Sequence, residues 1–398
     1  MRKSFSVKAE NIKPSATLQI SAKASELKKN GVDIISLSIG EPDFSTPEYI
    51  IEGTKKALVE RLTKYAPVAG VPSLKKVLSE KLFKENGLNY DENQIVVSTG
   101  AKSSVYHALF ALLNEGDEVI IPSPYWLSYP EMVALNCGTS VCVCTKKEND
   151  YKITAKELQN AITPKTKCLI LNSPNNPTGA VYSRDELEKL AKVIVKNNIF
   201  VLSDEVYEKF VFNGNRHVSI ASLGKEIYDR TITVNAVSKT YAMTGYRIGY
   251  LATNEKLAKL ISSVQSHTTS GANTFAQYGA ITAVSEENGE LDKMIAEFDK
   301  RRKILISCLS SLKGVSFVEP AGAFYVMLDV SGYYGKTFNG TKIADSFDFS
   351  RELLSEGVAV VPGKPFGSDE CVRLAYTVEK SKIEEAVRRI DNFLKKII

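Results

Sequence analysis

The chain has 398 residues, of which 43% are apolar and 24% charged, a composition that excludes a disordered or fibrous protein. At roughly 150 residues per domain, this length predicts two or three structural units. No apolar run approaches the roughly 18 residues of a membrane helix. The N-terminus, Met1-Arg2-Lys3-Ser4-Phe5-Ser6, leads into charged residues and not into the apolar stretch of a signal peptide. We therefore expect a cytoplasmic protein with no membrane segment.

The net charge of +5 arises from 51 basic and 46 acidic residues, without a long block of either sign. Nucleic-acid-binding proteins usually concentrate positive charge on one face, so we expect no nucleic-acid partner. The six cysteines include no C-x-x-C pair, and the three histidines (His107, His217 and His267) are far apart in the sequence. This spacing favours neither a metal site nor a disulfide framework.

The predicted elements begin with a helix over residues 16–29, for which Ser15 is a candidate N-cap. From about residue 95 to 255, apolar runs of strand length alternate with helical stretches. The strand-like runs are residues 95–98, 118–121 (stopping at Pro122), 168–171, 199–202 and 231–234. One helix is predicted from Gly100 to Leu112, and another after the capping-box pattern Ser183-Arg184-Asp185-Glu186. Apolar strands separated by helices are typical of an α/β fold with a largely parallel sheet covered on both faces.

Four residues follow predicted strands of this sheet: Gly100, Asn176, Asp204 and Lys239. In such sheets ligands bind at the carboxyl ends of the strands. The pattern therefore predicts a functional site at that edge.

The last hundred residues have a different pattern, typical of a smaller α+β domain. The predicted elements are a charged helix at 292–312, strands at 315–318 and 324–328 around a turn at 320–323, and helices at 349–356 and 383–395.

One lysine is placed for covalent chemistry. Gly335-Lys336-Thr337 resembles the end of a phosphate-binding P-loop, but Val330 occupies the required upstream glycine position. Lys239, in contrast, stands between a buried-type strand and a glycine-containing apolar stretch. A lysine at the end of a strand can form a Schiff base with an aldehyde cofactor.

Six separated motifs, in order, carry a family resemblance over almost the whole chain, from Lys13 to Phe393. They are Gly40-Glu41-Pro42-Asp43-Phe44, Tyr65-Ala66-Pro67, Asn176-Pro177-Thr178-Gly179, Ser203-Asp204-Glu205-Val206-Tyr207, the 239–247 segment, and Val372-Arg373-Leu374. In these motifs the sequence resembles fold-type I, pyridoxal-phosphate-dependent aminotransferases. The resemblance implies a large domain with a mostly parallel seven-stranded sheet and a smaller α+β domain. The expected boundaries are residues 1–46 (N-terminal arm and part of the small domain), 47–288 (cofactor domain) and 289–398 (small domain).

The resemblance assigns roles at the reacting centre. Lys239 would carry pyridoxal 5'-phosphate and move a proton, helped by Arg247, whose charge lowers the pKa of the amine. Asp204 would pair with the ring nitrogen, and Tyr207 and Asn176 would donate hydrogen bonds to the phenolic oxygen. Two alternatives remain: Asp204 as a helix cap, and Asn176 as the start of a turn.

Other residues would hold the phosphate and the α-carboxylate. The backbone N–H groups of Ala101 and Lys102, together with Arg247 and Ser238, would bind the phosphate. Tyr65 would reach the phosphate of a neighbouring subunit, which implies a homodimer with active sites at the interface. Trp126 would stack on the cofactor, with a core aromatic as the alternative.

The substrate α-carboxylate would be bound by Arg373 near Gly40, with Trp126 and Asn176 also at the substrate. For Arg373 the alternative is a surface salt bridge.

The spans 13–17, 123–126 and 128–132 resemble bacterial and plant aspartate aminotransferases, a subgroup that includes prephenate-using enzymes. By this resemblance, Lys102 with Ser15 and Thr17 would bind the distal carboxylate of a dicarboxylate substrate. Capping by Ser15 alone and a solvated Lys102 remain alternatives. Tyr246 departs from the tryptophan common in relatives.

The expected activity is amino transfer from L-aspartate to 2-oxoglutarate, giving oxaloacetate and L-glutamate by a ping-pong cycle. A prephenate, aromatic or broad-specificity aminotransferase is the alternative. A non-catalytic regulator that binds the cofactor as a ligand is the rival from another class, and it would normally carry a DNA-binding domain.

Overall fold

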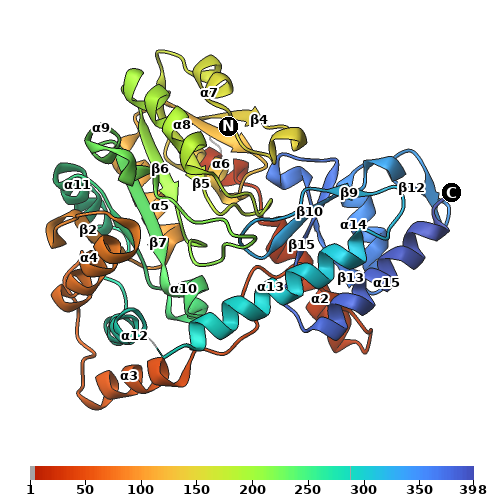
Figure 1. The fold of residues 1–398 in the computed structure, drawn as a ribbon, viewed down its shortest axis with the longest axis horizontal. Coiled ribbons are helices and arrows are strands. Elements are labelled where there is room, and N and C mark those ends of the chain that lie inside the picture. The colour runs from red at the N-terminus through yellow and green to blue at the C-terminus, as the bar shows by residue number, and fades with distance from the viewer. Residues whose placement is uncertain (1–4, 287) are drawn as a thin grey trace.

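The computed structural model describes residues 5–286 and 288–398 (Figure 1). The predicted absence of a signal peptide concerns in part residues 1–4, which lie outside the described residues. Within the described part of the chain, no helix has both the length and the apolar character needed to span a bilayer.

A seven-stranded sheet forms the centre of the larger part of the molecule, in the order β2-β8-β7-β6-β5-β3-β4. Only β8 runs antiparallel to its neighbours, which confirms the mostly parallel sheet expected from the sequence. The strands are β2 (Ile95–Ser98), β3 (Glu118–Ser123), β4 (Thr139–Cys144), β5 (Thr166–Asn172), β6 (Phe200–Asp204), β7 (Thr231–Ala236) and β8 (Gly249–Ala252).

Helices cover both faces of this sheet, as the continuous apolar strands predict. Successive residues of β5 show the two faces: Ile170 packs in the cluster with α5, α6 and α11, and Leu169 packs in the cluster with α7 and α8. The helices of this part are α3 (Glu48–Val59), α4 (Pro72–Asn86), α5 (Ala101–Leu112), α6 (Ser128–Leu135), α7 (Ala155–Ala161), α8 (Arg184–Lys196), α9 (Lys225–Tyr228), α10 (Val237–Thr240), α11 (Glu255–Ser266) and α12 (Thr274–Ser285). The predicted capping box is present at the start of α8, where Ser183 and Glu186 bond reciprocally.

The end predicted for β3 was wrong. The strand continues through Pro122, which pairs with Val143 of β4. Beyond Ile120 the strand no longer pairs with β5, so one side of the strand is free of ladder bonds. A residue without an N–H group is tolerated where the strand has only one partner.

The smaller part is built on a four-stranded antiparallel sheet of order β14-β15-β10-β9. Its strands are β9 (Ser316–Phe317), β10 (Tyr325–Asp329), β14 (Val361–Pro362) and β15 (Cys371–Ala375); its short pairs are β1 (Ile35–Ser36) with β13 (Val358–Ala359) and β11 (Thr337–Phe338) with β12 (Thr341–Lys342). Its helices are α13 (Glu290–Leu309), α14 (Ser346–Ser355) and α15 (Lys380–Lys396).

The N-terminal segment returns to this smaller part. It contains α1 (Val7–Asn11) and α2 (Ala16–Lys29), followed by β1. Ala24 of α2 packs with Leu354 and Ala359, and β1 pairs in parallel with β13. Chain segments more than 300 residues apart in sequence thereby lie side by side (Figure 1).

The carboxyl ends of β2, β5, β6 and β7 point to one edge, since these four strands run parallel. The smaller part lies against this edge: the Tyr125 N–H donates to the Phe366 carbonyl at 3.0 Å, and Val211 forms an isolated bridge with Gly322. The predicted site residues therefore lie between two sheets.

The N-terminus of α5 is packed closely against β8. A Cβ at residue 249 would lie 2.2 Å from the backbone nitrogen of Ala101, so only glycine permits this approach. Gly100, which precedes α5, has φ +81° and turns the chain into the helix.

Gly249→Ala should push β8 and α5 apart and reduce the free energy of unfolding by about 1–3 kcal/mol, the usual range for overpacking. Gly245→Ala is the matched control, because a Cβ there meets nothing within 4 Å. Denaturant unfolding of both variants beside the parent protein checks this. Equal stability of the two variants would contradict the packing account.

Candidate active site

A cavity of about 430 Å³ opens at the carboxyl edge of the large sheet. Thirteen of the fourteen site residues predicted from the sequence line it: Ser15, Thr17, Gly40, Ala101, Lys102, Trp126, Asn176, Asp204, Tyr207, Ser238, Lys239, Arg247 and Arg373. Tyr65 is the exception. Its side chain is fully exposed in the segment between α3 and α4, away from this cavity.

Lys239 reaches the cavity from α10, a single turn that follows β7. Its Nζ donates a hydrogen bond to the Gly40 carbonyl at 2.6 Å. Burial lowers the pKa of Lys239 to about 8; Glu41 acts in the opposite direction, and Arg247 and Arg373 lower it further. The contribution expected of Arg247 is present, but burial is the larger cause. At this pKa a far larger fraction of the amine is neutral at pH 7 than at the ordinary value of 10.5, while most of it remains protonated.

Asp204 is the last residue of β6 and is only 4% exposed. Its Oδ2 accepts from the Tyr129 hydroxyl at 2.7 Å, and its Oδ1 accepts from the Val206 N–H at 3.3 Å. Burial raises the pKa of Asp204 to about 6, against the hydrogen bond from Tyr129, which lowers it. The bond to Val206 belongs to a turn and not to a helix start, so the helix-cap alternative is wrong, and the carboxylate lies at the cavity wall.

Arg373, in the middle of β15, is a buried cation with 2% exposure. Its Nη1 donates to Asn176 Oδ1 at 3.0 Å and its Nη2 to the Ser38 carbonyl at 2.8 Å. The guanidinium carbon lies 4.6 Å from the centre of the Tyr325 ring, an arrangement that stabilises a desolvated cation.

No carboxylate in residues 5–286 and 288–398 is recorded in an ion pair with Arg373, and its buried Nε has no hydrogen-bond partner there. The alternative of a surface salt bridge is therefore wrong. A buried, uncompensated guanidinium fits an anionic ligand.

Two aromatic hydroxyls complete this wall. The hydroxyls of Tyr207 and Tyr325 lie 2.8 Å apart, and the two rings meet edge to face. A Cβ at Gly40 would lie 2.4 Å from the Tyr325 hydroxyl oxygen, so a larger residue there would displace that hydroxyl.

The start of α5 is a second part of the cavity with features that would stabilise an anion. The first residues of a helix have N–H groups without intrahelical partners, and the helix dipole favours negative charge there. A Cβ at Gly100 would lie 2.4 Å from Arg247 Nη2, so the guanidinium lies directly beside this helix start. Ser238 and Lys102 line the same cavity. Free N–H groups beside an arginine fit a phosphate group.

Lys102, Ser15 and Thr17 line the cavity together. Lys102 Nζ lies 5.0 Å from the centre of the Trp126 ring, and partial burial and Arg247 lower its pKa. Ser15 caps α2 by accepting a hydrogen bond from the Leu18 N–H at 3.4 Å. Ser15 therefore both caps the helix and lines the cavity.

Several lining residues had no predicted role: Tyr129, Tyr325, Glu41 and Thr244. Tyr129 and Tyr325 touch predicted site residues, and Glu41 accepts a hydrogen bond from the Thr244 hydroxyl. Glu41, Thr244 and Tyr129 lie within segments that carried the resemblance, so their neighbours there gave a signal. Tyr325 lies in none of these segments and reaches the cavity through the packing of distant segments.

The profile of the family described as aminotransferase class I and II matches residues 32–390. An aspartate aminotransferase of Bacillus sp. (strain YM-2) is 44% identical over 99% of this chain and 100% of its own length. A probable aspartate/prephenate aminotransferase of Aquifex aeolicus is 44% identical over 100% of both chains. Two solved structures of aspartate aminotransferases are similar to this chain over nearly its whole length. That from Rhizobium meliloti has a TM-score of 0.95 and 37% identity, covering 100% of both chains. That from Thermus thermophilus, with maleate, has a TM-score of 0.92 and 39% identity, covering 98% of this chain and 100% of its own. The chain therefore belongs to the aminotransferase class I and II family.

Proposed function

We propose that this chain is a pyridoxal-phosphate-dependent aspartate aminotransferase that exchanges an amino group between L-aspartate and 2-oxoglutarate. The observation that carries the proposal is one cavity that holds a lysine of lowered pKa, a buried carboxylate and three further cations, Lys102, Arg247 and Arg373. The names of the Bacillus and Rhizobium relatives support the choice of substrate.

The residues present fit pyridoxal phosphate. The start of α5 with Arg247 and Ser238 would hold the phosphate, and Trp126 would lie against the ring. When bound, the cofactor supplies an aldehyde carbon that takes up amino groups and a ring that accepts the electron pair left at Cα. Asp204, the most buried carboxylate lining the cavity, would pair with the ring nitrogen. Its pKa of about 6 leaves it ionised at neutral pH, so it can hold a proton on that nitrogen.

Lys239 would bind the aldehyde and then, once released, move the proton to and from the substrate Cα through Nζ. Its pKa of about 8 suits both tasks, since a general base works best when its pKa is near the operating pH. Tyr207 and the amide nitrogen of Asn176 would donate hydrogen bonds to the ring oxygen. Asn176 Oδ1 is bonded to Arg373, which orients that amide.

Arg373, near Gly40, would bind the α-carboxylate as a two-pronged donor. The remaining cation, Lys102, with the Ser15 and Thr17 hydroxyls, would bind the distal carboxylate. Maleate, which accompanies the Thermus thermophilus relative, also carries two carboxylates.

A second candidate is a prephenate or broad-specificity activity. The Aquifex relative bears the name aspartate/prephenate aminotransferase. The apolar side chains of Leu18 and Ile39 line the cavity although they are 69% and 43% exposed, so a larger ring-bearing substrate would meet an apolar surface.

We also propose that the active unit is a homodimer. Each subunit would consist of an N-terminal arm with part of the small domain (residues 1–46), a cofactor domain (47–288) and the rest of the small domain (289–398). The exposed Tyr65 does not line the cavity of its own chain and would reach the phosphate site of a second copy. The end of α12 at Ser285 and the start of α13 at Glu290 support the second boundary.

The test of this function is the visible absorbance of the cofactor-loaded protein during each half-reaction. Excess L-aspartate without a keto acid should abolish the band, and 2-oxoglutarate should restore it. Loss of the band with phenylalanine but not with aspartate would favour the second candidate. No band after incubation with pyridoxal phosphate would contradict the cofactor and with it the function.

Lys102→Ala should lower kcat/KM for aspartate by about 10- to 100-fold, because a charge-assisted hydrogen bond contributes about 1.5–3 kcal/mol. Phenylalanine, which has no distal carboxylate, is the matched control and should be affected by less than about threefold. Steady-state kinetics with both substrates checks this selectivity. Equal losses for the two substrates would contradict the placement of Lys102.

The rate at which apoprotein captures pyridoxal phosphate should rise with pH and level off above about 8, because only the neutral amine of Lys239 attacks the aldehyde. Stopped-flow absorbance between pH 6 and 9 measures it. Lys239→Arg should bind the cofactor without covalent capture. A capture rate that still rises about tenfold per pH unit up to pH 9 would show that burial does not lower the pKa of the amine.

A further inference from the structure

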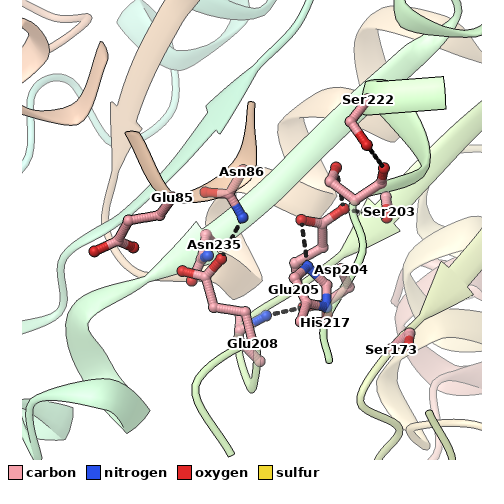
Figure 2. A network of polar contacts seen from close by, with 12 residues as sticks. Glu85, Asn86, Ser173, Ser203, Asp204, Glu205, Glu208, His217, Ser222 and Asn235 are labelled. Carbon is pink, nitrogen blue, oxygen red and sulfur yellow. Dashed lines mark hydrogen bonds and ion pairs between the residues drawn. The ribbon is translucent and has the colours of Figure 1, made fainter. Parts of the chain in front are cut away.

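A buried polar network includes Glu205 and Glu208, which follow Asp204 in the chain, and its ion-paired side chains do not line the catalytic cavity (Figure 2). Glu205 accepts hydrogen bonds from the Ser203 and Ser219 hydroxyls at 2.7 Å each, and its other oxygen lies 3.0 Å from His217 Nε2. Nothing in the proposed reaction uses these groups.

A second ion pair completes the network. Glu208 binds the ammonium of Lys81, a residue of α4, through one oxygen, and Asn86 Nδ2 donates to the other at 2.7 Å. The side chains of Lys81, Glu208 and Glu205 are 7%, 6% and 1% exposed, and that of His217 is 9% exposed. Two carboxylates therefore lie in the protein interior opposite one lysine and one histidine.

The charges balance only if His217 carries a proton. Burial alone would lower the pKa of His217, but the carboxylates of Glu205 and Glu208 reverse this effect and raise it. Glu208, beside Lys81, has its pKa lowered to about 2, so it remains ionised. The other titratable or charged groups around the pair are Lys81, Glu85, Tyr90, Asp204, Lys209, Tyr241 and Tyr250.

A proton on His217 explains this site better than a bound metal ion. The ligand atoms of Glu205, Glu208 and His217 lie within 4.8 Å of one another, a spacing that a metal ion can use. However, the Lys81 ammonium already contacts Glu208, so a divalent ion would have to displace it. With His217 protonated, the charges of Lys81, His217, Glu205 and Glu208 also sum to zero without a metal ion.

The position of Glu205 gives this balance a consequence for Asp204. The two residues are consecutive, and the negative charge of Glu205 raises the pKa of Asp204. An uncompensated carboxylate there would oppose ionisation of Asp204, because charges interact strongly in a buried environment. A proton on His217 cancels that charge.

We propose that protonated His217 is a positioning residue that neutralises Glu205 and thereby keeps Asp204 ionised for its partner, the cofactor ring nitrogen. The Lys81–Glu208 pair anchors the other end of the same segment to α4. The role of Asp204 in this proposal rests on the proposed function. The charge state of the His217–Glu205 pair does not.

The first arm of the test needs no cofactor. It compares the unfolding of apoprotein carrying His217→Gln with His267→Gln, the same change at an exposed histidine. Because the pKa of His217 is raised on folding, its stabilisation is fully present below about pH 6.5 and is lost as the pH rises through the folded value. His217→Gln should therefore lower Tm most at pH 6 and progressively less toward pH 9. A pH-independent loss, or the same profile in both variants, would overturn the charge assignment.

The second arm measures the pH midpoint of the visible band of the loaded protein. His217→Gln should move the acid limb to higher pH by about one unit, which corresponds to a tenfold change in the acid dissociation constant of Asp204. The double variant with Glu205→Gln and His217→Gln lacks both charges, so its midpoint should return to the parent value. This rescue would report the charge and not the original hydrogen bond, because both side chains of that bond have changed. An unmoved midpoint in His217→Gln, or no rescue in the double variant, would overturn the proposal. Absence of any visible band would contradict the proposed function, while the first arm would still decide the charge of His217.

Discussion

Burial of ionisable side chains at one edge of the large sheet is the constraint on which this site depends. Removal from water moves the pKa of Lys239 down from 10.5 to about 8 and that of Asp204 up from 3.8 to about 6. Both shifts come mainly from desolvation, so the same packing that closes the core also brings the two groups near neutral pH. Arg373, with its unpartnered Nε, is held in the same environment by aromatic rings and carbonyl oxygens.

The fold supplies this environment by joining two sheets. The parallel sheet presents Asp204 and Lys239 at strand ends, and the antiparallel sheet presents Tyr325 and Arg373 from paired strands. The segment from Ser38 to Gly40 lies between them: Ser38 accepts from Arg373, and Gly40 accepts from Lys239. Gly40 and Gly249 have no Cβ, which permits the close approaches at this junction.

The α/β architecture and most of the site could be predicted from the sequence, for physical reasons. The strands of the parallel sheet are buried on both faces, so they read as continuous apolar runs, and residues after them necessarily meet at one edge. The resemblance to aminotransferases named thirteen of the lining residues, and the family is confirmed by the matched profile. Local rules also placed α2, α5 and the capping box of α8 correctly.

What escaped prediction depends on long-range packing. Tyr129 reaches Asp204 across 75 positions of sequence, and Tyr325 reaches Tyr207 across 118. The pairing of Lys81 with Glu208 spans 127 positions, and neither residue stands out in a single sequence. Spacing rules cover neighbours on a helix or a strand, so they give no signal for such contacts. The end of β3 was wrong for a similar reason, because it depends on which neighbouring strands are present beside Pro122.

The central claim is that the cavity at the strand ends transfers an amino group from a dicarboxylic amino acid through Lys239. Its most direct measurement follows the nitrogen itself: the loaded enzyme is given ¹⁵N-labelled L-aspartate and unlabelled 2-oxoglutarate, and the products are analysed by mass spectrometry. The account predicts ¹⁵N in L-glutamate, with formation of oxaloacetate in equal amount, and loss of nearly all of this transfer in Lys239→Ala. The account would be contradicted if glutamate contained no ¹⁵N and the aspartate stayed unconverted. Undiminished transfer in Lys239→Ala would also contradict it.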